Sequence, residues 1–118
     1  MKAVKSALVG VAMLGLAGAA HAQEQFIPMA GYWVGPYAAG GSGIYGGFID
    51  YVNMINARDG GLNGVKLTYE KCETEYNNAR GVECYERLKN KGPTGASVFH
   101  MLSTGITYAL TDKTATDK

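Results

Sequence analysis

The chain has 118 residues, of which 47% are hydrophobic and 18% are charged, and its formal net charge is +1. This composition is typical of a globular protein, and it provides neither a basic stripe for nucleic acid nor a charged tail. The length allows one small domain at most.

Residues 1–22 have the pattern of a signal peptide. Lys2 and Lys5 precede the uncharged run Ser6–Ala20, and Ala20-His21-Ala22 provides the small-x-small pattern that signal peptidase cleaves. The run is short and broken by glycine, so we expect no membrane anchor; a buried N-terminal helix is the alternative. Cleavage would leave an exported chain of residues 23–118 with a net charge of −1, because nine basic and ten acidic residues remain.

The exported chain would contain two cysteines, Cys72 and Cys84. In an oxidising compartment we expect them to form a disulfide, which would stabilise the fold by roughly 3 kcal/mol. A zinc site is the alternative, but two thiols without further Cys or His ligands fall short of tetrahedral coordination. We therefore expect no metal.

The first predicted elements are a strand and a helix, separated by a glycine-rich loop. Phe26–Val34 is rich in large apolar residues and predicts the strand, and Gly35–Gly43 predicts the loop. A helix begins at Ile44, where apolar residues recur at helical spacing, and ends at Gly60-Gly61. The residues expected to face the core are Ile44, Phe48, Tyr51, Val52 and Ile55.

A second strand and a second helix follow. Val65–Cys72 alternates between apolar and polar residues, which predicts a strand. Asn78 can cap a helix that turns Cys84 at least partly inward and ends at Gly92-Pro93. The apolar side of this helix is expected to consist of Ala79, Val82, Tyr85 and Leu88.

The last elements complete an alternating pattern. Ala96–Leu102 is a nearly continuous apolar run, as expected of a strand covered on both faces, and Ser103-Thr104-Gly105 opens a third helix. The alternation predicts an α/β fold in which a parallel sheet lies between two helical layers, a three-layer sandwich. Ligands bind such sheets beyond the carboxyl ends of the strands, so the loops Gly35–Gly43 and Leu102–Thr107 are the candidate functional edge.

One glycine pattern makes an exported α/β oxidoreductase the alternative function. Gly41-Ser42-Gly43-Ile44-Tyr45-Gly46 matches the dinucleotide-binding fingerprint, with Glu70 as the acidic residue that would bind the ribose. However, Gly35–Gly40 separates it from the strand, and an exported chain reaches a compartment poor in nicotinamide cofactors. No nucleophile pattern surrounds Ser103 either, so we expect no cofactor and no enzyme activity.

Hydroxyl groups gather at the start of the third helix, on Ser103, Thr104 and Thr107. They can cap the helix, and they can also complete the shell around a ligand carboxylate at the positive end of the helix. His100 lies in the apolar run and is expected to be a hydrogen-bonded core residue.

Two further groups of residues are expected to be structural. The carboxylates Asp50, Glu70, Glu73 and Glu75 have no spacing that demands acid–base chemistry, so we expect them to be solvated. Core packing is the expectation for the aromatic residues around the first loop, with a cleft lining as the alternative. These are Tyr32, Trp33, Tyr37 and Tyr45.

Several stretches resemble the type I periplasmic solute-binding proteins of ABC transporters, most of all the branched-chain amino acid and amide group. They are Gly35-Pro36-Tyr37 with its glycine-rich loop, Phe48–Asn56 ending in Met-Ile-Asn, and Asp59-Gly60-Gly61-Leu62-Asn63-Gly64. The resemblance runs over nearly all of Phe26–Lys118. It implies a two-lobed protein that closes on a small solute and delivers it to a membrane permease.

The resemblance also implies site residues. Ser103 matches the serine that binds the α-carboxylate in branched-chain amino acid members, Thr104 lies beside it, and Tyr37 and Gly41 are expected to line the site. Where the family has a bulky aromatic residue in the first loop, this chain has glycine near Gly40, so leucine-like specificity does not follow. The Cys72–Cys84 spacing is similar to that of the amide, urea and other polar-solute branches.

Members of this family are several times longer than this chain, which would then hold only part of the first lobe. Such a fragment would have open sheet edges, so we expect it to be marginally stable and to bind no solute tightly. An extracellular sensor domain of the same fold is a further alternative. It would need a transmembrane segment beyond residue 118.

Overall fold

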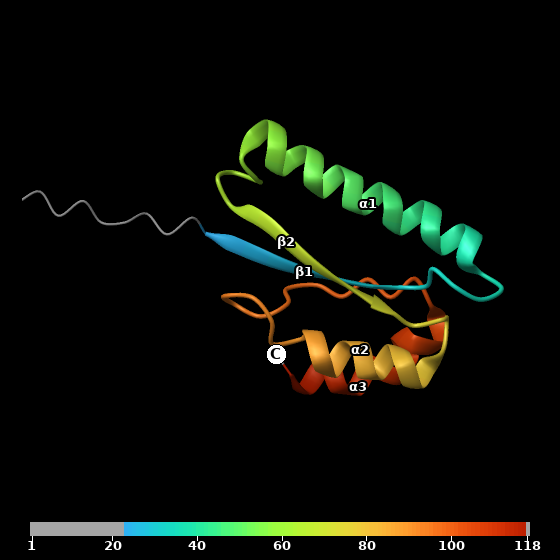
Figure 1. Cartoon of the computed structure of the whole chain (residues 1–118). Helices are drawn as coiled ribbons and strands as arrows, with labels where there is room; N and C mark the ends of the chain where they lie inside the picture. The colour runs from blue at the N-terminus through green and yellow to red at the C-terminus, as the bar shows by residue number, and fades with distance from the viewer. Residues whose placement is uncertain (1–22, 118) are drawn as a thin grey trace, which may run out of the picture.

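The computed structural model describes residues 23–117, so the predicted signal peptide, residues 1–22, lies outside the described part. Strands and helices alternate through most of it (Figure 1). The elements are β1 (Glu24–Gly31), α1 (Ala38–Asp59), β2 (Lys66–Glu73), α2 (Asn78–Leu88) and α3 (Thr104–Thr116). None of the helices in this part of the chain has the length and hydrophobicity needed to cross a membrane.

β1 and β2 form a parallel sheet in which Glu24 pairs with Lys66 and Gly31 pairs with Glu73. α1 covers one face of the sheet, and α2 and α3 cover the other (Figure 1). The predicted parallel α/β arrangement of three layers is therefore confirmed. β1 ends earlier than predicted, because the amide of Trp33 donates a hydrogen bond to the Glu73 side chain and not to a strand backbone.

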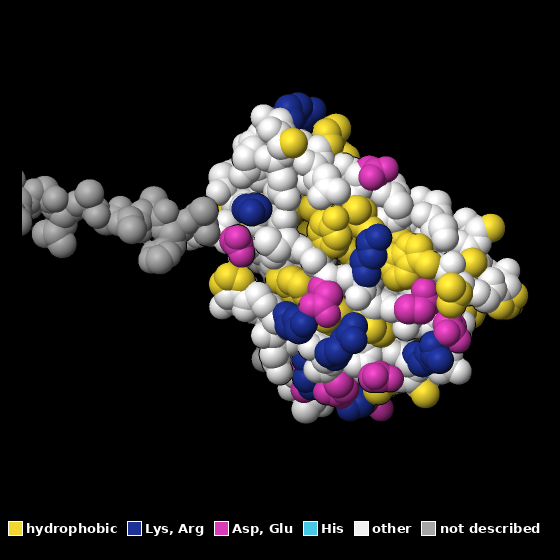
Figure 2. Space-filling view, viewed as in Figure 1, with side chains coloured by type: hydrophobic (Ala, Val, Ile, Leu, Met, Phe, Trp, Pro, Cys, Tyr) yellow, Lys and Arg dark blue, Asp and Glu magenta, His cyan; other side chains and the backbone are white. Residues whose placement is uncertain are grey.

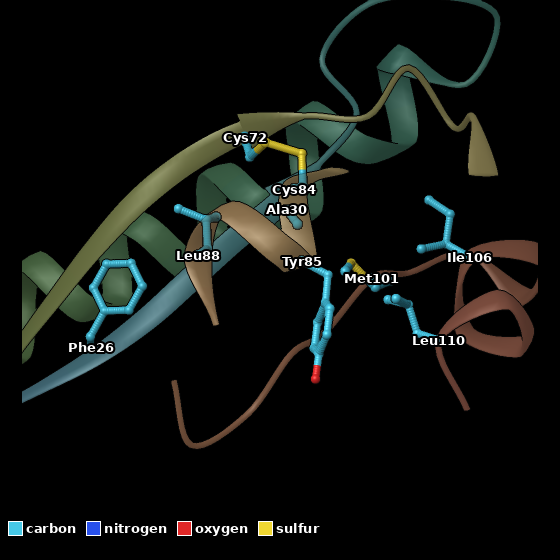
Figure 3. Packing of buried hydrophobic residues seen from close by; sticks show 9 residues of the cluster. All are labelled: Phe26, Ala30, Cys72, Cys84, Tyr85, Leu88, Met101, Ile106 and Leu110. Carbon is cyan, nitrogen blue, oxygen red and sulfur yellow. A yellow bond between two sulfur atoms is a disulfide. The ribbon is translucent and has the colours of Figure 1, made fainter. Parts of the chain in front are cut away.

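Each face of the sheet has its own hydrophobic cluster. The cluster under α1 consists of Met29, Tyr32, Tyr45, Ile49 and Val52. The cluster under α2 and α3 is larger (Figure 3), and its buried members are Phe26, Ala30, Cys72, Cys84, Tyr85, Leu88, Met101, Ile106 and Leu110. Within it, Cys72 of β2 and Cys84 of α2 form the predicted disulfide, with their Cα atoms 5.8 Å apart.

The prediction of a loop over Gly35–Gly43 is wrong for most of that range, because α1 already begins at Ala38 and includes most of these glycines. The predicted core face of α1 is also wrong for Ile44, Phe48 and Tyr51, whose side chains are 44 to 59% exposed. The buried residues are Gly41, Tyr45, Ile49, Val52 and Ile55. The helix thus has two apolar stripes, and the stripe that contains the small Gly41 faces the sheet.

The predicted third strand, Ala96–Leu102, is not part of the sheet. Its contact with a strand is a single parallel bridge between Phe26 and Ala96. Further along, the buried Tyr45 hydroxyl lies 2.9 Å from the carbonyl oxygen of Ala30 and 2.8 Å from that of His100, so a side chain joins the two segments. Burial, with the nearby Tyr32, raises the pKa of Tyr45, so the hydroxyl keeps the proton that it donates.

The prediction that His100 is a core residue is also wrong, because its side chain is exposed. Its ring lies 5.7 Å from the ring of Phe48, measured between centroids. Both residues lie at an apolar hollow of about 370 Å³ between α1 and the extended segment, together with Tyr51 and Val98. Apolar residues of the segment 96–102 therefore lie near α1 as well as in the core.

α2 and α3 pack side by side because Gly81 leaves room for Ile106. The Ile106 side chain would lie 2.4 Å from a Cβ at position 81.

The cap of α2 is Asn77, not the predicted Asn78. The Asn77 side chain accepts a hydrogen bond from the Arg80 amide at 3.1 Å. Of the predicted apolar side, Tyr85 and Leu88 are buried, whereas Ala79 is exposed. The helix ends at Leu88, before Gly92-Pro93.

The end of α3 is tied to α2 through Asp117. The Lys89 ammonium lies 2.7 Å from the Asp117 carboxylate, and the Tyr85 hydroxyl donates to the same oxygen at 3.0 Å. These hydrogen bonds, that of Lys89 first, hold the pKa of Asp117 below its ordinary value. The contact therefore joins the C-terminal end of α3 to α2.

Candidate functional site

The starts of all three helices lie at one edge of the molecule, where β1 and β2 end (Figure 1). α3 begins beside α2, because a Cβ on Gly105 would lie 2.6 Å from the side-chain oxygen of Asn78. We call this region the carboxyl edge and define it as residues 32–37, 74–78 and 102–105. It is the place where open α/β sheets bind their ligands.

Glu73 connects two segments of the carboxyl edge. One carboxylate oxygen accepts a hydrogen bond from the Trp33 amide at 2.8 Å, and the other accepts one from the Glu75 amide at 2.7 Å. The next residue, Thr74, is fully buried, and its amide donates to the Gly31 carbonyl at 2.7 Å. The expectation that Glu73 is a solvated carboxylate is therefore wrong, because it ties the end of β1 to the loop after β2.

The other carboxylates lie nearer to expectation. Asp50 is exposed on α1. Glu70 forms a surface ion pair with Lys91, and Glu75 forms one with Arg80. Such exposed pairs contribute little to stability. Within the described residues, no group of His, Cys, Asp or Glu could hold a metal ion.

Strained backbone gathers at the carboxyl edge. Glu75, Tyr76 and Leu102 have φ angles of 49°, 60° and 47°, which side chains larger than glycine rarely adopt. A strained backbone conformation persists only where neighbouring groups stabilise it. Here the hydroxyl of the buried Thr74 accepts a hydrogen bond from the Tyr76 amide at 3.2 Å. The structure thus fixes the direction of Tyr76 and, through Leu102, the approach to α3.

Aromatic rings line the carboxyl edge. Tyr32 and Tyr45 are buried, as expected, and Trp33 is half-buried, whereas Tyr37 is 56% exposed. The Tyr37 ring lies 4.6 Å from the ring of Tyr76, which sequence reasoning missed because Tyr76 stands alone in a polar loop. Figure 2 shows hydrophobic side chains at this edge and over β2, while charged side chains lie mainly over α2.

Ser103 and Thr104 begin α3 at the carboxyl edge. Ser103 is buried, and its hydroxyl oxygen accepts a hydrogen bond from the Ile106 amide at 3.4 Å, so its predicted role as a cap is confirmed. Thr104 is exposed. The Thr107 hydroxyl donates back to the Ser103 carbonyl at 2.9 Å and so reinforces the first turn.

Gly41 lies at a close packing contact. A Cβ on Gly41 would lie 1.9 Å from the carbonyl oxygen of Tyr32. Because Gly41, Gly43 and Gly46 all lie inside α1, they form no strand-to-helix turn, and the geometry that a dinucleotide fingerprint requires is absent. This corrects the alternative interpretation of the glycine pattern. It also shows that Gly41 serves the contact between α1 and the end of β1.

Known proteins of one kind share this arrangement. Residues 24–118 match a family model described as periplasmic binding protein. A comparison with curated proteins found no match.

Two solved structures are similar to the chain. A protein described as an ABC transporter permease from the Pseudomonas fluorescens group is 43% identical, with a TM-score of 0.76. A fatty acid ABC transporter substrate-binding protein from Thermomonospora curvata is 21% identical, with a TM-score of 0.70, which shows a shared fold. Each comparison covers 80% of this chain but 23% of the other protein, so the chain spans about a quarter of the length of these relatives.

Proposed function

Because the chain belongs to the periplasmic binding protein family, we propose that it forms part of the first lobe of the solute-binding component of an ABC transporter. The observation that carries the proposal is the convergence of three helix starts on the carboxyl edge (Figure 1). A second lobe would close over this edge, and a membrane permease would receive the solute. The signal-peptide pattern of residues 1–22 supports export to the periplasm.

The activity that we propose is binding, not catalysis. The glycine pattern that favoured an oxidoreductase is helical, and the Glu73 carboxylate is already occupied by two amides. The carboxyl edge provides hydroxyls, aromatic rings and helix N-termini, which are groups that hold a small molecule without transforming it.

We propose that the solute is a small carboxylate or amide, such as a branched-chain amino acid or a related compound. Its oxygen atoms would lie at the start of α3, close to the start of α2. Helix starts offer unpaired N–H groups and a partial positive charge. The Ser103 hydroxyl accepts a hydrogen bond within the helix, which leaves its own proton available for an anion. The exposed Thr104 adds a second hydroxyl.

An NMR titration of the isotope-labelled chain tests this proposal. Part of one lobe provides only one wall of the site, so we expect weak binding. Leucine, valine, acetamide and urea should therefore be added at millimolar concentration. We expect at least one of them to shift the amide resonances of Thr104 and Gly105. If the active compound is an amino acid, its decarboxylated amine should have no effect.

A pair of variants sharpens the test. Ser103→Ala should reduce the shift, whereas Thr116→Ala, which removes a hydroxyl from the far end of the same helix, should leave it unchanged. The proposal is wrong if none of the four compounds shifts the amides at the start of α3.

A further inference from the structure

We propose that Tyr37 and Tyr76 form an aromatic wall that binds a planar aromatic group of the solute. This inference rests on the proposed function and narrows the solute to an aromatic carboxylate or amide. The two rings come from different segments, Tyr37 from the connection between β1 and α1 and Tyr76 from the loop after β2. Their centroids lie 4.6 Å apart and their planes are inclined by 43°.

The wall is backed by the core but open to solvent. The Tyr76 ring also packs edge-on against the buried Tyr32, with 5.1 Å between the ring centroids. Tyr37 and Tyr76 nevertheless remain 56% and 37% exposed. The pair therefore has a fixed inner side and an accessible outer side, and aromatic rings prefer offset or edge-to-face contacts with other rings at such distances.

Both rings are held by the backbone. The Tyr37 carbonyl accepts hydrogen bonds from the amides of Gly40 and Gly41 at 3.1 and 3.2 Å, so it is part of the first turn of α1. Tyr76 has a left-handed backbone, φ 60°, that glycine or asparagine would adopt more easily. From this position the Tyr76 ring packs against the rings of Tyr32 and Tyr37.

Two features favour an aromatic anion over a cation. The Glu75 carboxylate beside Tyr76 is paired with Arg80, which offsets its charge. The N-terminus of α2 begins directly after the wall and has a partial positive charge, which repels cations. An aromatic ring on the wall would therefore place an attached carboxylate near the helix starts.

A comparison of benzoate with cyclohexanecarboxylate tests the wall, because both compounds have the same charge and ring size but only benzoate is planar and aromatic. The NMR titration of the labelled chain should show roughly 2- to 10-fold tighter binding of benzoate. In Tyr37→Leu this preference should disappear. It should persist in Tyr108→Leu, which removes a 77% exposed tyrosine from α3.

Each other outcome has a defined meaning. Equal affinity for the two acids, a preference that survives Tyr37→Leu, or tighter binding of choline than of benzoate would overturn the aromatic wall. An undispersed amide spectrum would overturn it too, since the wall exists only in the folded chain. If both acids shift Thr104 equally, the wall is wrong and the proposed function stands. If benzoate is preferred but no compound shifts Thr104, the wall stands and the carboxylate site at α3 is wrong.

Discussion

Replacing Gly41 by alanine should destabilise the fold, whereas the same replacement at Gly43 should stabilise it. A Cβ on Gly41 would lie 1.9 Å from the carbonyl oxygen of Tyr32 and 2.4 Å from its ring, both impossible contacts. The carbonyl belongs to the backbone, so no change of rotamer relieves the clash. Around Gly43, two residues further along the same helix, nothing lies within 4 Å of the new Cβ.

The two substitutions differ in sign. Overpacking costs about 1–3 kcal/mol or more, and a clash with backbone lies at the upper end, partly offset by the helix propensity of alanine. We expect a net loss of about 2 kcal/mol for Gly41→Ala and a gain of about 0.5–1 kcal/mol for Gly43→Ala. Because 1 kcal/mol corresponds to about 4–8 °C in a domain of this size, the two melting temperatures should differ by about 10 °C or more.

Thermal unfolding followed by far-UV circular dichroism measures this difference, with the unmodified chain as reference. Gly40→Ala is a second control, since its new Cβ would also meet nothing within 4 Å. Equal melting temperatures for Gly41→Ala and Gly43→Ala would refute the close contact between α1 and Tyr32. They would also remove the packing explanation of Gly41.

Three further predictions concern stability. Reducing the Cys72–Cys84 disulfide should lower the free energy of unfolding by roughly 3 kcal/mol, and mass spectrometry of the unreduced chain should find no free thiol; two alkylated cysteines would contradict the bridge. Tyr45→Phe should cost about 1–3 kcal/mol in urea unfolding, because it removes the hydroxyl whose single proton is shared between the carbonyls of Ala30 and His100; an unchanged midpoint would show that this contact contributes nothing. Hydrogen bonds from Lys89 and Tyr85 lower the pKa of Asp117, so its contribution to stability is present above the ordinary aspartate pKa of about 3.9 and is lost as the pH falls through the lowered value. Melting temperatures between about pH 2 and 6 should therefore fall less steeply in Asp117→Asn than in the unmodified chain, and parallel curves would contradict the contact.

Local patterns predicted most of the elements correctly. The alternation in β2, the glycine stop of α1 at Gly60 and the hydroxyl cap of α3 at Ser103 depend on neighbouring residues, so they could be recognised without a fold. Recognition of the parallel α/β arrangement followed from the order of these elements. The disulfide could also be predicted, because an exported chain with two cysteines allows a single intramolecular pairing.

The candidate site could be predicted only in part. Ser103, Thr104 and Tyr37 were expected at the edge and are found there, although their contact with a solute stays a prediction. Tyr76 was missed as a member of the site, and Glu73 was missed as the residue that connects two of its segments, because their partners, Tyr37 and Trp33, lie far away in the sequence. No local signal distinguishes a carboxylate that clamps two loops from one that faces water.

The sequence by itself determined where β2, α2 and α3 form, since hydrophobic period and capping act between residues a few positions apart. Only the tertiary structure decided which stripe of α1 is buried, because Gly41 faces the sheet by fitting against the Tyr32 carbonyl. It also decided that residues 96–102 stay outside the sheet, where the Tyr45 hydroxyl joins them to β1 in place of a continuous strand ladder. Both outcomes depend on groups that come together only when the chain has folded.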